Sequence, residues 1–442
     1  MKLSLGVIAD DHTGGTDVAA ALGNSGLRVL LCFDHPELPE VPAEYDAVVI
    51  ALKSRMLGAC EAVAAVRAAN DWLRGHAEQV YFKYCSTFDS TRDGNIGPVL
   101  DLLRQEAEAA ITVGTPATPQ HGRTVSASTL FVDGVPLAES HMRHHPVTPM
   151  TKSDLVALLA EQSSSEVAAL HLEEVRGPEE ALVERIEQRR REGAMHLIAD
   201  AVDEADLDAI AAATAGLPVV AGAAGFAAAI GRRLARQRAT ALAGASAKAA
   251  VSVAVRGRAD ARASVPAEAP AAVVLAGSCS TATLGQLERL KDAGHDGFRI
   301  DPRTGSAEHI AAEALAWFDA ATPRADAPFF FASTSASELA RIHADLGRDL
   351  AARRVEDVIG QIAVGLRDRG VRRIIAAGGE TSGAVVDALD IRSARVGDEE
   401  APGVPWIYPT STELEVLLKS GNFGDPDLLV RAAAAAPSGA VA

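Results

Sequence analysis

Short apolar runs alternate with longer stretches of helical composition along most of the chain. The first apolar run, residues 3–9, is short enough for one buried parallel strand, and a helical stretch follows at 18–22. Short strands separated by helical runs predict βαβ units. We therefore expect an α/β fold of two domains, each with a mainly parallel sheet flanked by helices. Further strand-like runs lie at residues 27–33, 47–51, 80–84, 196–200, 218–226, 272–276, 329–331 and 371–377.

The composition changes between residues 236 and 272, where Ala, Ser, Arg and Pro dominate. Such a segment is typical of an extended linker. A chain of 442 residues is long enough for two or three domains with ample cores. We therefore predict a first domain at 1–240, a linker at 241–271 and a second domain at 272–442.

The charge balance argues against some classes of partner. The 59 acidic and 42 basic residues give a formal net charge of −17, which disfavours nonspecific binding to nucleic acid or to an anionic membrane. Four scattered cysteines without a CxxC pair are typical of reduced thiols rather than of a disulfide or zinc framework. With no signal-like opening and no long apolar run, we expect a cytoplasmic protein without a membrane partner.

Polar side chains follow three predicted strands of the first domain. Asp10 and Asp11 come directly after the first strand, and adjacent carboxylates are costly unless a cation, a basic residue or a substrate proton compensates. Ligands of open α/β sheets bind at the carboxyl ends of the strands. A capped turn with solvated acids is the alternative interpretation. We predict a pocket for a small anionic, hydroxylated ligand, formed by Asp10, Asp11, Ser54, Arg55, Lys83, Ser86, Thr87 and Asp89.

Residues 114–150 are irregular and rich in proline, which indicates a lid or a wall of the substrate pocket. The segment contains Arg123 and the histidines His141, His144 and His145. Their spacing matches no standard zinc pattern, and we favour an exposed or hydrogen-bonding role over metal ligation.

Three glycine-rich turns mark the second domain, at residues 277–280, 378–383 and 421–424. A glycine-rich turn that leads into a helix presents backbone N–H groups and the positive end of the helix dipole, which suits phosphate. Neither a P-loop nor a G-x-G-x-x-G motif is present. The alternative is a set of tight turns that merely need glycine.

Six motifs follow one another in order and cover nearly the whole chain outside the linker: Ala9–Asp17, Lys83–Thr91, Asn95–Gly97, Ala276–Ser280, Gly378–Gly383 and Lys419–Gly424. Together they resemble the four-carbon acid sugar kinase family. The resemblance implies an N-terminal sugar-acid domain, a C-terminal ATP domain, and transfer of the γ-phosphate to the C4 hydroxyl of 3-oxo-tetronate. Departures from the family pattern at His12, Gly15, Thr115–Pro119 and Ser128–Thr129 leave threonate and erythronate open as acceptors.

On this resemblance we expect an enzyme that binds a small sugar acid and uses ATP with Mg²⁺, with a homodimer as one option for assembly. The Mg²⁺ ligands stay unassigned. Asp10 or Asp11 orients or deprotonates the attacking hydroxyl, or holds it through Mg²⁺. We favour Asp10 as the catalytic carboxylate and Asp11 as the cap or metal-side partner. The predicted catalytic residues are Asp10, Asp11 and Lys83; the predicted substrate-binding residues are Arg55, Ser86, Thr87, Asp89 and Arg123; the predicted ATP-binding residues are Ser278, Gly378, Gly379, Glu380, Thr381, Ser382 and Gly421.

Two other function classes are compatible with the architecture. A noncatalytic sugar-acid sensor or transport-associated binding module is one, because fold alone does not fix function. An NAD-linked dehydrogenase is disfavoured by the missing dinucleotide fingerprint. The second set of glycine turns favours the kinase.

Overall fold

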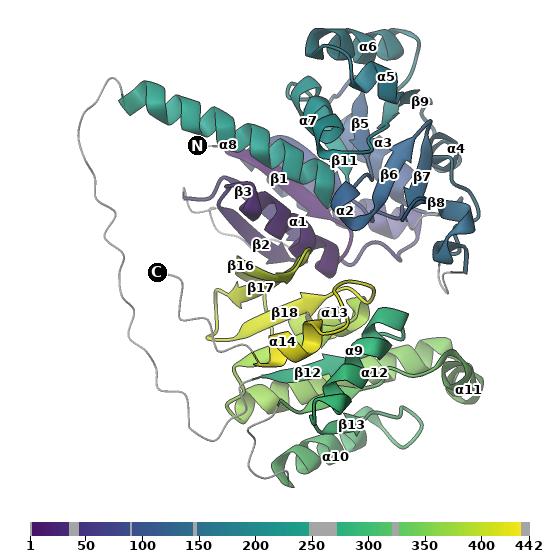
Figure 1. The fold of residues 1–442 in the computed structure, drawn as a ribbon, viewed down its shortest axis with the longest axis vertical. Coiled ribbons are helices and arrows are strands. Elements are labelled where there is room, and N and C mark those ends of the chain that lie inside the picture. Colours follow the sequence, from purple (N-terminus) through teal and green to yellow (C-terminus); the bar gives the residue numbers. More distant parts are fainter. Residues whose placement is uncertain are drawn as a thin grey trace. The chain divides into compact units, whose positions relative to one another are not determined.

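The computed structural model describes residues 2–34, 44–88, 91–144, 148–246, 272–320 and 327–434. The chain divides into two compact units, residues 1–248 and 249–442. Each unit is a mainly parallel sheet flanked by helices, which confirms the predicted fold class (Figure 1). No helix in these ranges is long and apolar enough to cross a membrane.

The sheet of the first unit is parallel throughout its described strands, in the order β2-β3-β1-β4-β11-β5-β10-β9. The strands are apolar and mostly buried, as expected for a sheet covered on both faces. Their bounds are β1 Leu3–Ala9, β2 Val29–Phe33, β3 Ala47–Ala51, β4 Ala77–Lys83, β5 Thr112–Thr115, β9 Val167–Leu170, β10 His196–Ala199 and β11 Val219–Gly222.

Two rows of helices flank this sheet. One row contains α1 (His12–Asn24), α7 (Glu204–Ala213) and α8 (Ala224–Ser246), and the other contains α2 (Ala59–His76), α3 (Ile96–Glu106) and α4 (Leu155–Ala160). The helices α5 (Leu172–Val175) and α6 (Glu179–Arg191) pack against α7. Because α8 runs to Ser246, residues 241–246 of the predicted linker are helical. Residues 247–271 lie outside the described residues.

The segment 114–150 is more regular than predicted, because it contains a small antiparallel sheet. Its strands are β6 (Arg123–Ser126), β7 (Thr129–Val132) and β8 (Val135–Pro136). Two-residue turns join them: Ala127 and Ser128 have φ of 48° and 61°, and Asp133 and Gly134 have φ of 51° and 80°. Positive φ at both central positions matches the twist of a hairpin, and Asp-Gly is a strong signal for such a turn. The sequence therefore carried a hairpin signal that the proline content obscured.

The sheet of the second unit has the order β13-β14-β12-β15-β18-β17-β16, with its first five strands parallel and the last two antiparallel. An apolar cluster joins one face of this sheet to α9 and α14, with Val274, Phe329, Leu287 and Leu428 among its members. The bounds are β12 Val273–Ala276, β13 Gly297–Arg299, β14 Phe329–Phe331, β15 Arg373–Ala377, β16 Ser393–Ala401, β17 Val404–Pro409 and β18 Glu415–Lys419, with helices α9 Thr281–Asp292, α10 Ala307–Ala320, α11 Ala336–Leu346, α12 Arg348–Asp368, α13 Gly379–Ala388 and α14 Leu428–Ala434.

A buried polar network joins α3 to the starts of β5 and β10. His196 is fully buried and bonds Thr112 Oγ1 through Nδ1 (2.7 Å) and Asp101 Oδ1 through Nε2 (2.9 Å). The Asp101 carboxylate also accepts hydrogen bonds from residues 163–165. Burial alone would raise the pKa of Asp101, but the hydrogen bonds from His196 and the serines hold it well below its ordinary value. These contacts make the network a structural tether.

We expect Asp101→Asn to lower the free energy of unfolding of the first unit by about 2 kcal/mol, because the amide turns a donor toward hydroxyl and N–H donors. Urea denaturation at pH 7 measures this loss. Since the folded pKa of Asp101 is depressed, its stabilisation is complete above about pH 4 and is lost as the pH falls further. The difference between the two proteins should therefore shrink in acid.

Asp154→Asn is the matched control for this substitution. Asp154 is exposed and caps α4 by accepting from the N–H of Ala157 (3.0 Å). Asparagine caps helices about as well as aspartate, so this variant should unfold like the wild type. Equal loss in the two variants would contradict the role given to the buried network.

Candidate active site

The register of the first sheet brings the ends of its central strands level. Ala9 of β1 lies beside Ala51 of β3 and Lys83 of β4. Asp10 is the next residue, and its N–H donates to the carbonyl oxygen of Lys83 (3.0 Å). From β1 the chain continues to strands on one side, β2 and β3, and then crosses to β4 on the other side. Ligands bind at such a switch point in open α/β sheets.

Arg55 joins the two adjacent carboxylates at this point. Its Nε and Nη2 donate to the two oxygens of Asp10 at 2.9 and 2.8 Å, and Nη2 also donates to Asp11 Oδ1 at 2.6 Å. A bidentate guanidinium–carboxylate pair is both strong and directional. No described residue accepts a hydrogen bond from Nη1 of Arg55.

The two carboxylates differ in their proton affinity. Burial raises the pKa of Asp10, and the neighbouring charge of Asp11 adds to this, while Arg55 and Lys83 act in the opposite direction. Burial also opposes ionisation of Asp11, but Arg55, Lys83 and the hydrogen bonds from Thr13 and Gly14 lower its pKa overall. Asp10 is therefore the more basic of the pair.

Asp11 also caps α1, and this fixes its carboxylate. Asp11 Oδ1 accepts from the N–H of Gly14 (2.9 Å), and Oδ2 accepts from Thr13 Oγ1 (2.7 Å). The buried Lys83 approaches the same turn, with its Nζ 3.8 Å from Asp17 Oδ2. A Cβ on Gly14 would lie 2.2 Å from Asp11 Oδ1 and 2.8 Å from Lys83 Nζ. Glycine at this position therefore lets the acid and the amine meet at the helix start.

Asn95 orients the loop that carries Arg55, a role that the sequence analysis did not predict. Its Nδ2 donates to the carbonyl oxygens of Ser54 (2.9 Å), Arg55 (3.2 Å) and Leu57 (3.0 Å). Asn95 is buried at the start of α3. Its position inside a recognised motif was the signal that could have pointed to this clamp.

The other predicted substrate residues are Ser86, Thr87, Asp89 and Arg123, and the structure describes three of them. Ser86 and Thr87 form the turn after β4, and Thr87 Oγ1 lies 3.0 Å from Cys85 Sγ. Asp89 lies outside the described residues. Arg123 begins β6, donates through Nη1 to the carbonyl of His121, and has a buried Nε without an acceptor among the described residues. No contact described here brings Arg123 to Asp10.

His12, a departure from the family pattern, lies beside the acid pair at the start of α1. It is buried, its Nε2 is 3.2 Å from Asp34 Oδ1, and its ring meets Phe33 edge-on. His141 and His144 belong to a short 3₁₀ helix, and His145 lies outside the described residues. Within the described ranges no group of three or more His, Cys, Asp or Glu side chains could hold a metal ion.

The second unit repeats this arrangement of level strand ends. Ala276 of β12 lies beside Ala377 of β15, which lies beside Lys419 of β18. The chain leaves β12 for β13 and β14 on one side and then crosses to β15, so the switch point lies between β12 and β15. The turns after all three strands meet here: the N–H groups of residues 277 and 278 donate to the carbonyl of Ala377 at 3.2 and 3.3 Å.

Glycines allow these turns to press against one another. A Cβ on Gly277 would lie 2.5 Å from Thr381 Oγ1, and a Cβ on Gly421 would lie 2.5 Å from Ser278 Oγ. Gly378 has φ of 131°, a conformation that favours glycine. Gly379, by contrast, is exposed, and a Cβ there would meet nothing within 4 Å. The turn therefore requires its glycine at Gly378 rather than at Gly379.

The other predicted ATP residues line the start of α13. Glu380 is exposed in its first turn, and Thr381 is buried. Ser382 is fully buried, and its hydroxyl has no partner among the described residues. The helix α9 starts at the neighbouring turn, where Ser280 caps it. Two helix N-termini thus point toward one strand edge, which favours an anion.

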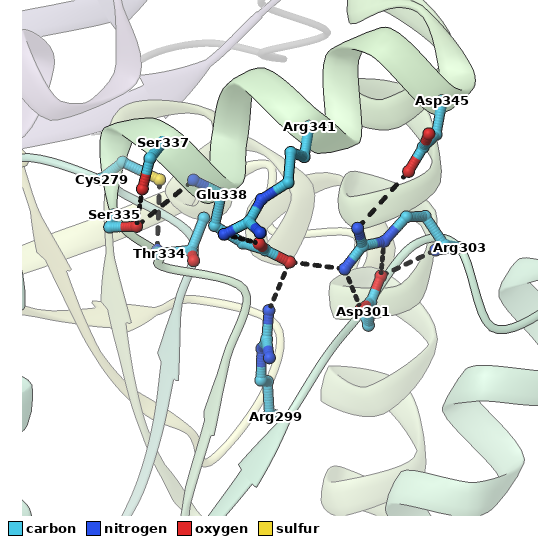
Figure 2. A network of polar contacts seen from close by, with 10 residues as sticks. All are labelled: Cys279, Arg299, Asp301, Arg303, Thr334, Ser335, Ser337, Glu338, Arg341 and Asp345. Atoms are coloured by element: carbon cyan, nitrogen blue, oxygen red, sulfur yellow. Dashed lines mark hydrogen bonds and ion pairs between the residues drawn. The ribbon is translucent and has the colours of Figure 1, made fainter.

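An ion-pair network braces the loops beside this edge (Figure 2). Glu338 of α11 accepts from Arg303 (2.6 Å), Arg341 (2.9 Å) and Arg299 (3.3 Å). The N–H of Thr334 donates to Cys279 Sγ (3.4 Å), which links the turn after β14 to the turn after β12. The sequence pattern gave no signal for this network, because its members come from separate segments.

Comparison with known proteins identifies the family. The sugar-binding N-terminal domain family matches residues 5–230, and the nucleotide-binding C-terminal domain family matches residues 273–429. This chain belongs to the four-carbon acid sugar kinase family. The predicted family and the enzyme class, an ATP-dependent kinase, are therefore confirmed.

Relatives of this kinase cover almost its whole length. Proteins named 3-oxo-tetronate kinase from Cupriavidus necator and Pseudomonas fluorescens are 42% and 41% identical to it, over 96% and 97% of this chain and 95% and 96% of their own length. A solved structure from Salmonella typhimurium LT2, provisionally described as a tRNA synthase, has a TM-score of 0.80 and 35% identity. One from Haemophilus influenzae has a TM-score of 0.72 and 34% identity, and each match covers 97% of this chain and 98% of the other.

We expect Gly14→Ala to lower kcat/KM of this kinase roughly tenfold or more, because the new methyl group would displace the Asp11 carboxylate and the Lys83 ammonium. Steady-state ADP release, with a thermal melt of each variant, measures the effect. Gly23→Ala is the control in the same helix, since a Cβ there meets nothing within 4 Å. It should keep full activity and melt no earlier than the wild type. Equal kinetics for the two variants would contradict the proposed crowding at Gly14.

Proposed function

We propose that this chain phosphorylates the C4 hydroxyl of 3-oxo-tetronate with ATP to give 3-oxo-tetronate 4-phosphate. The observation that carries the proposal is the Asp10–Asp11–Arg55 cluster with buried Lys83, at the strand ends of the sugar-binding unit. The names of relatives about 40% identical over nearly their full length support the same acceptor. Threonate and erythronate are the alternative acceptors.

The cationic groups of the cluster suit the carboxylate of a sugar acid. Arg55 holds Asp10 and Asp11 through Nε and Nη2. Its Nη1, which has no acceptor among the described residues, is proposed to bind the substrate carboxylate. Lys83 is proposed to neutralise negative charge on the acceptor or on the phosphoryl group during its transfer. The other proposed substrate residues are Ser86, Thr87, Asp89 and Arg123, whose hydroxyl, carboxylate and guanidinium groups suit a polyhydroxy acid.

Asp10 is proposed as the base that accepts the proton of the C4 hydroxyl. Its carboxylate points from the end of β1, is held by Arg55, and is the more basic of the two acids. Asp11, which is committed to the cap of α1, is proposed to hold the local geometry. Phosphoryl transfer depends mainly on positioning and charge neutralisation, so a modest base is sufficient.

ATP is proposed to bind the turns of the nucleotide-binding unit through residues 278, 378–382 and 421. Mg²⁺ is proposed to enter with the nucleotide as MgATP, with phosphates and water as its main ligands. A cytoplasmic location and a homodimer stay predictions from the sequence.

The decisive experiment is a coupled ADP-release assay with 3-oxo-tetronates, threonates and erythronates side by side. We expect the highest kcat/KM with a 3-oxo-tetronate. An equal or higher kcat/KM with threonate or erythronate would show that 3-oxo-tetronate is not the preferred acceptor. An absence of ADP release with every four-carbon acid would refute the proposed kinase activity.

We expect Asp10→Asn to fold normally and to lose most of its turnover while it still binds ATP, since the amide keeps the shape but cannot accept the proton. Because the pKa of Asp10 is raised above its ordinary 3.8, the wild-type kcat/KM should fall in acid at a pH above that value. Steady-state kinetics over pH, with ATP titration by calorimetry, measures both effects.

Asp11→Asn is the matched comparison. Asparagine preserves the cap of α1, so this variant should lose less turnover than Asp10→Asn. Thermal melts of both variants control for folding. If Asp10→Asn were folded and turned over at a near-normal rate, the base would have to be sought elsewhere, with Asp89 as the next candidate.

A further inference from the structure

Three side chains donate hydrogen bonds to one backbone carbonyl of the turn after β18. The carbonyl oxygen of Gly421 accepts from Ser280 Oγ (2.6 Å), Thr283 Oγ1 (2.9 Å) and Lys419 Nζ (2.8 Å). Lys419 Nζ also lies 3.0 Å from Thr283 Oγ1. A single carbonyl thus receives three donors from β18 and from the start of α9, which fixes its direction.

The preceding carbonyl points to the same ammonium group. Ser420 O accepts from Lys419 Nζ (2.9 Å) and from the N–H of Phe423 (3.1 Å). In a trans peptide the N–H points opposite to the C=O of the same unit. With both carbonyls directed to Lys419, the N–H groups of Gly421 and Asn422 must point away from it.

These two N–H groups have no acceptor among the described residues. Successive backbone N–H groups that point the same way form a concave site for an anion. The site adjoins the first ATP turn, since a Cβ on Gly421 would lie 2.5 Å from Ser278 Oγ. It therefore lies at the strand edge where the N-termini of α9 and α13 already favour phosphate.

Lys419 itself is too deeply buried to bind a ligand. Its exposed fraction is 0%, and burial lowers its pKa to about 7. No carboxylate of the described residues pairs with it, so carbonyl and hydroxyl oxygens alone satisfy the ammonium. Burying an amine without a counter-ion costs free energy of folding. An apolar side chain would fill the same space at a lower cost if the position served packing alone.

We propose that Lys419 is a positioning residue for the nucleotide: it turns the carbonyls of Ser420 and Gly421 inward so that the N–H groups of Gly421 and Asn422 face the phosphates of ATP. The inference rests on the proposed function, because it takes ATP as the ligand of this unit. It assigns to Lys419 an indirect role, through the backbone, and not contact with the reacting atoms.

The test is Lys419→Met in the full chain, which keeps the length of the side chain and removes its donors. We expect the Kd for ADP, measured by calorimetry, and the KM for ATP to rise at least tenfold. The KM for the sugar acid should stay within twofold. A well-folded Lys419→Met protein with ADP affinity within twofold of the wild type would overturn the inference.

Arg373→Met is the matched control for the loss of a buried cation. Arg373 lies at the start of β15, pairs with Glu415 (2.9 Å) and stacks over the ring of Trp406 (4.1 Å). Its loss should lower the melting temperature and leave ADP affinity within twofold. If Arg373→Met weakened ADP binding as much as Lys419→Met, a general loss of packing would explain both, and the positioning role would be refuted.

Thr283→Val covers the case in which Lys419→Met does not fold. It removes one donor to Gly421 O and one partner of Lys419, and we expect at least a threefold rise in the Kd for ADP. An unchanged Kd would overturn the inference. A wild-type protein that binds no ADP would instead refute the proposed use of ATP, so the two failures are distinguishable.

Discussion

Level ends of neighbouring parallel strands are the constraint on which both sites depend. In the first unit the register sets Ala9, Ala51 and Lys83 side by side, so the residues that follow them gather at one edge. In the second unit the same pairing joins the turns after β12, β15 and β18. A one-residue slip would send each side chain to the opposite face of the sheet, so the apolar packing of the strands also fixes the site geometry.

The two units bury positive charge in different ways, and this difference fits their different ligands. Arg55 is matched by two carboxylates, and Asp10, the more basic of the two, can accept a proton. Among the described residues the partners of Lys419 are carbonyl and hydroxyl oxygens, without a carboxylate to balance the ammonium form. The first arrangement suits proton acceptance, and the second adds positive potential where phosphates are proposed to bind.

Much of the fold followed from sequence because its strands are short, apolar and separated by helical runs. The pairing of Arg55 with Asp10 and Asp11 did not follow, since the need for a compensating cation was visible but its identity depended on register. The hairpin at Asp133–Gly134 was missed within a proline-rich segment, and the role of Asn95 depends on three carbonyls that only the folded loop brings together. Residues 241–246 have the low-complexity composition of a linker, yet alanine is also the strongest helix former, and α8 continues through them.

The proposed roles of side chains and backbone predict which positions tolerate substitution. In the sugar-binding unit, the proposed chemistry lies on charged side chains, so we expect a change of residue type at Asp10 or Arg55 to alter the reaction directly. In the nucleotide-binding unit, the proposed ligands are mostly N–H groups, which every residue but proline carries. Phosphate recognition there is proposed to depend on backbone conformation, as at Gly378 with its φ of 131°. It also depends on buried side chains that orient the backbone carbonyls, as Lys419 does at Gly421. A buried residue that shapes backbone direction is therefore as informative about nucleotide binding as a residue that touches the nucleotide.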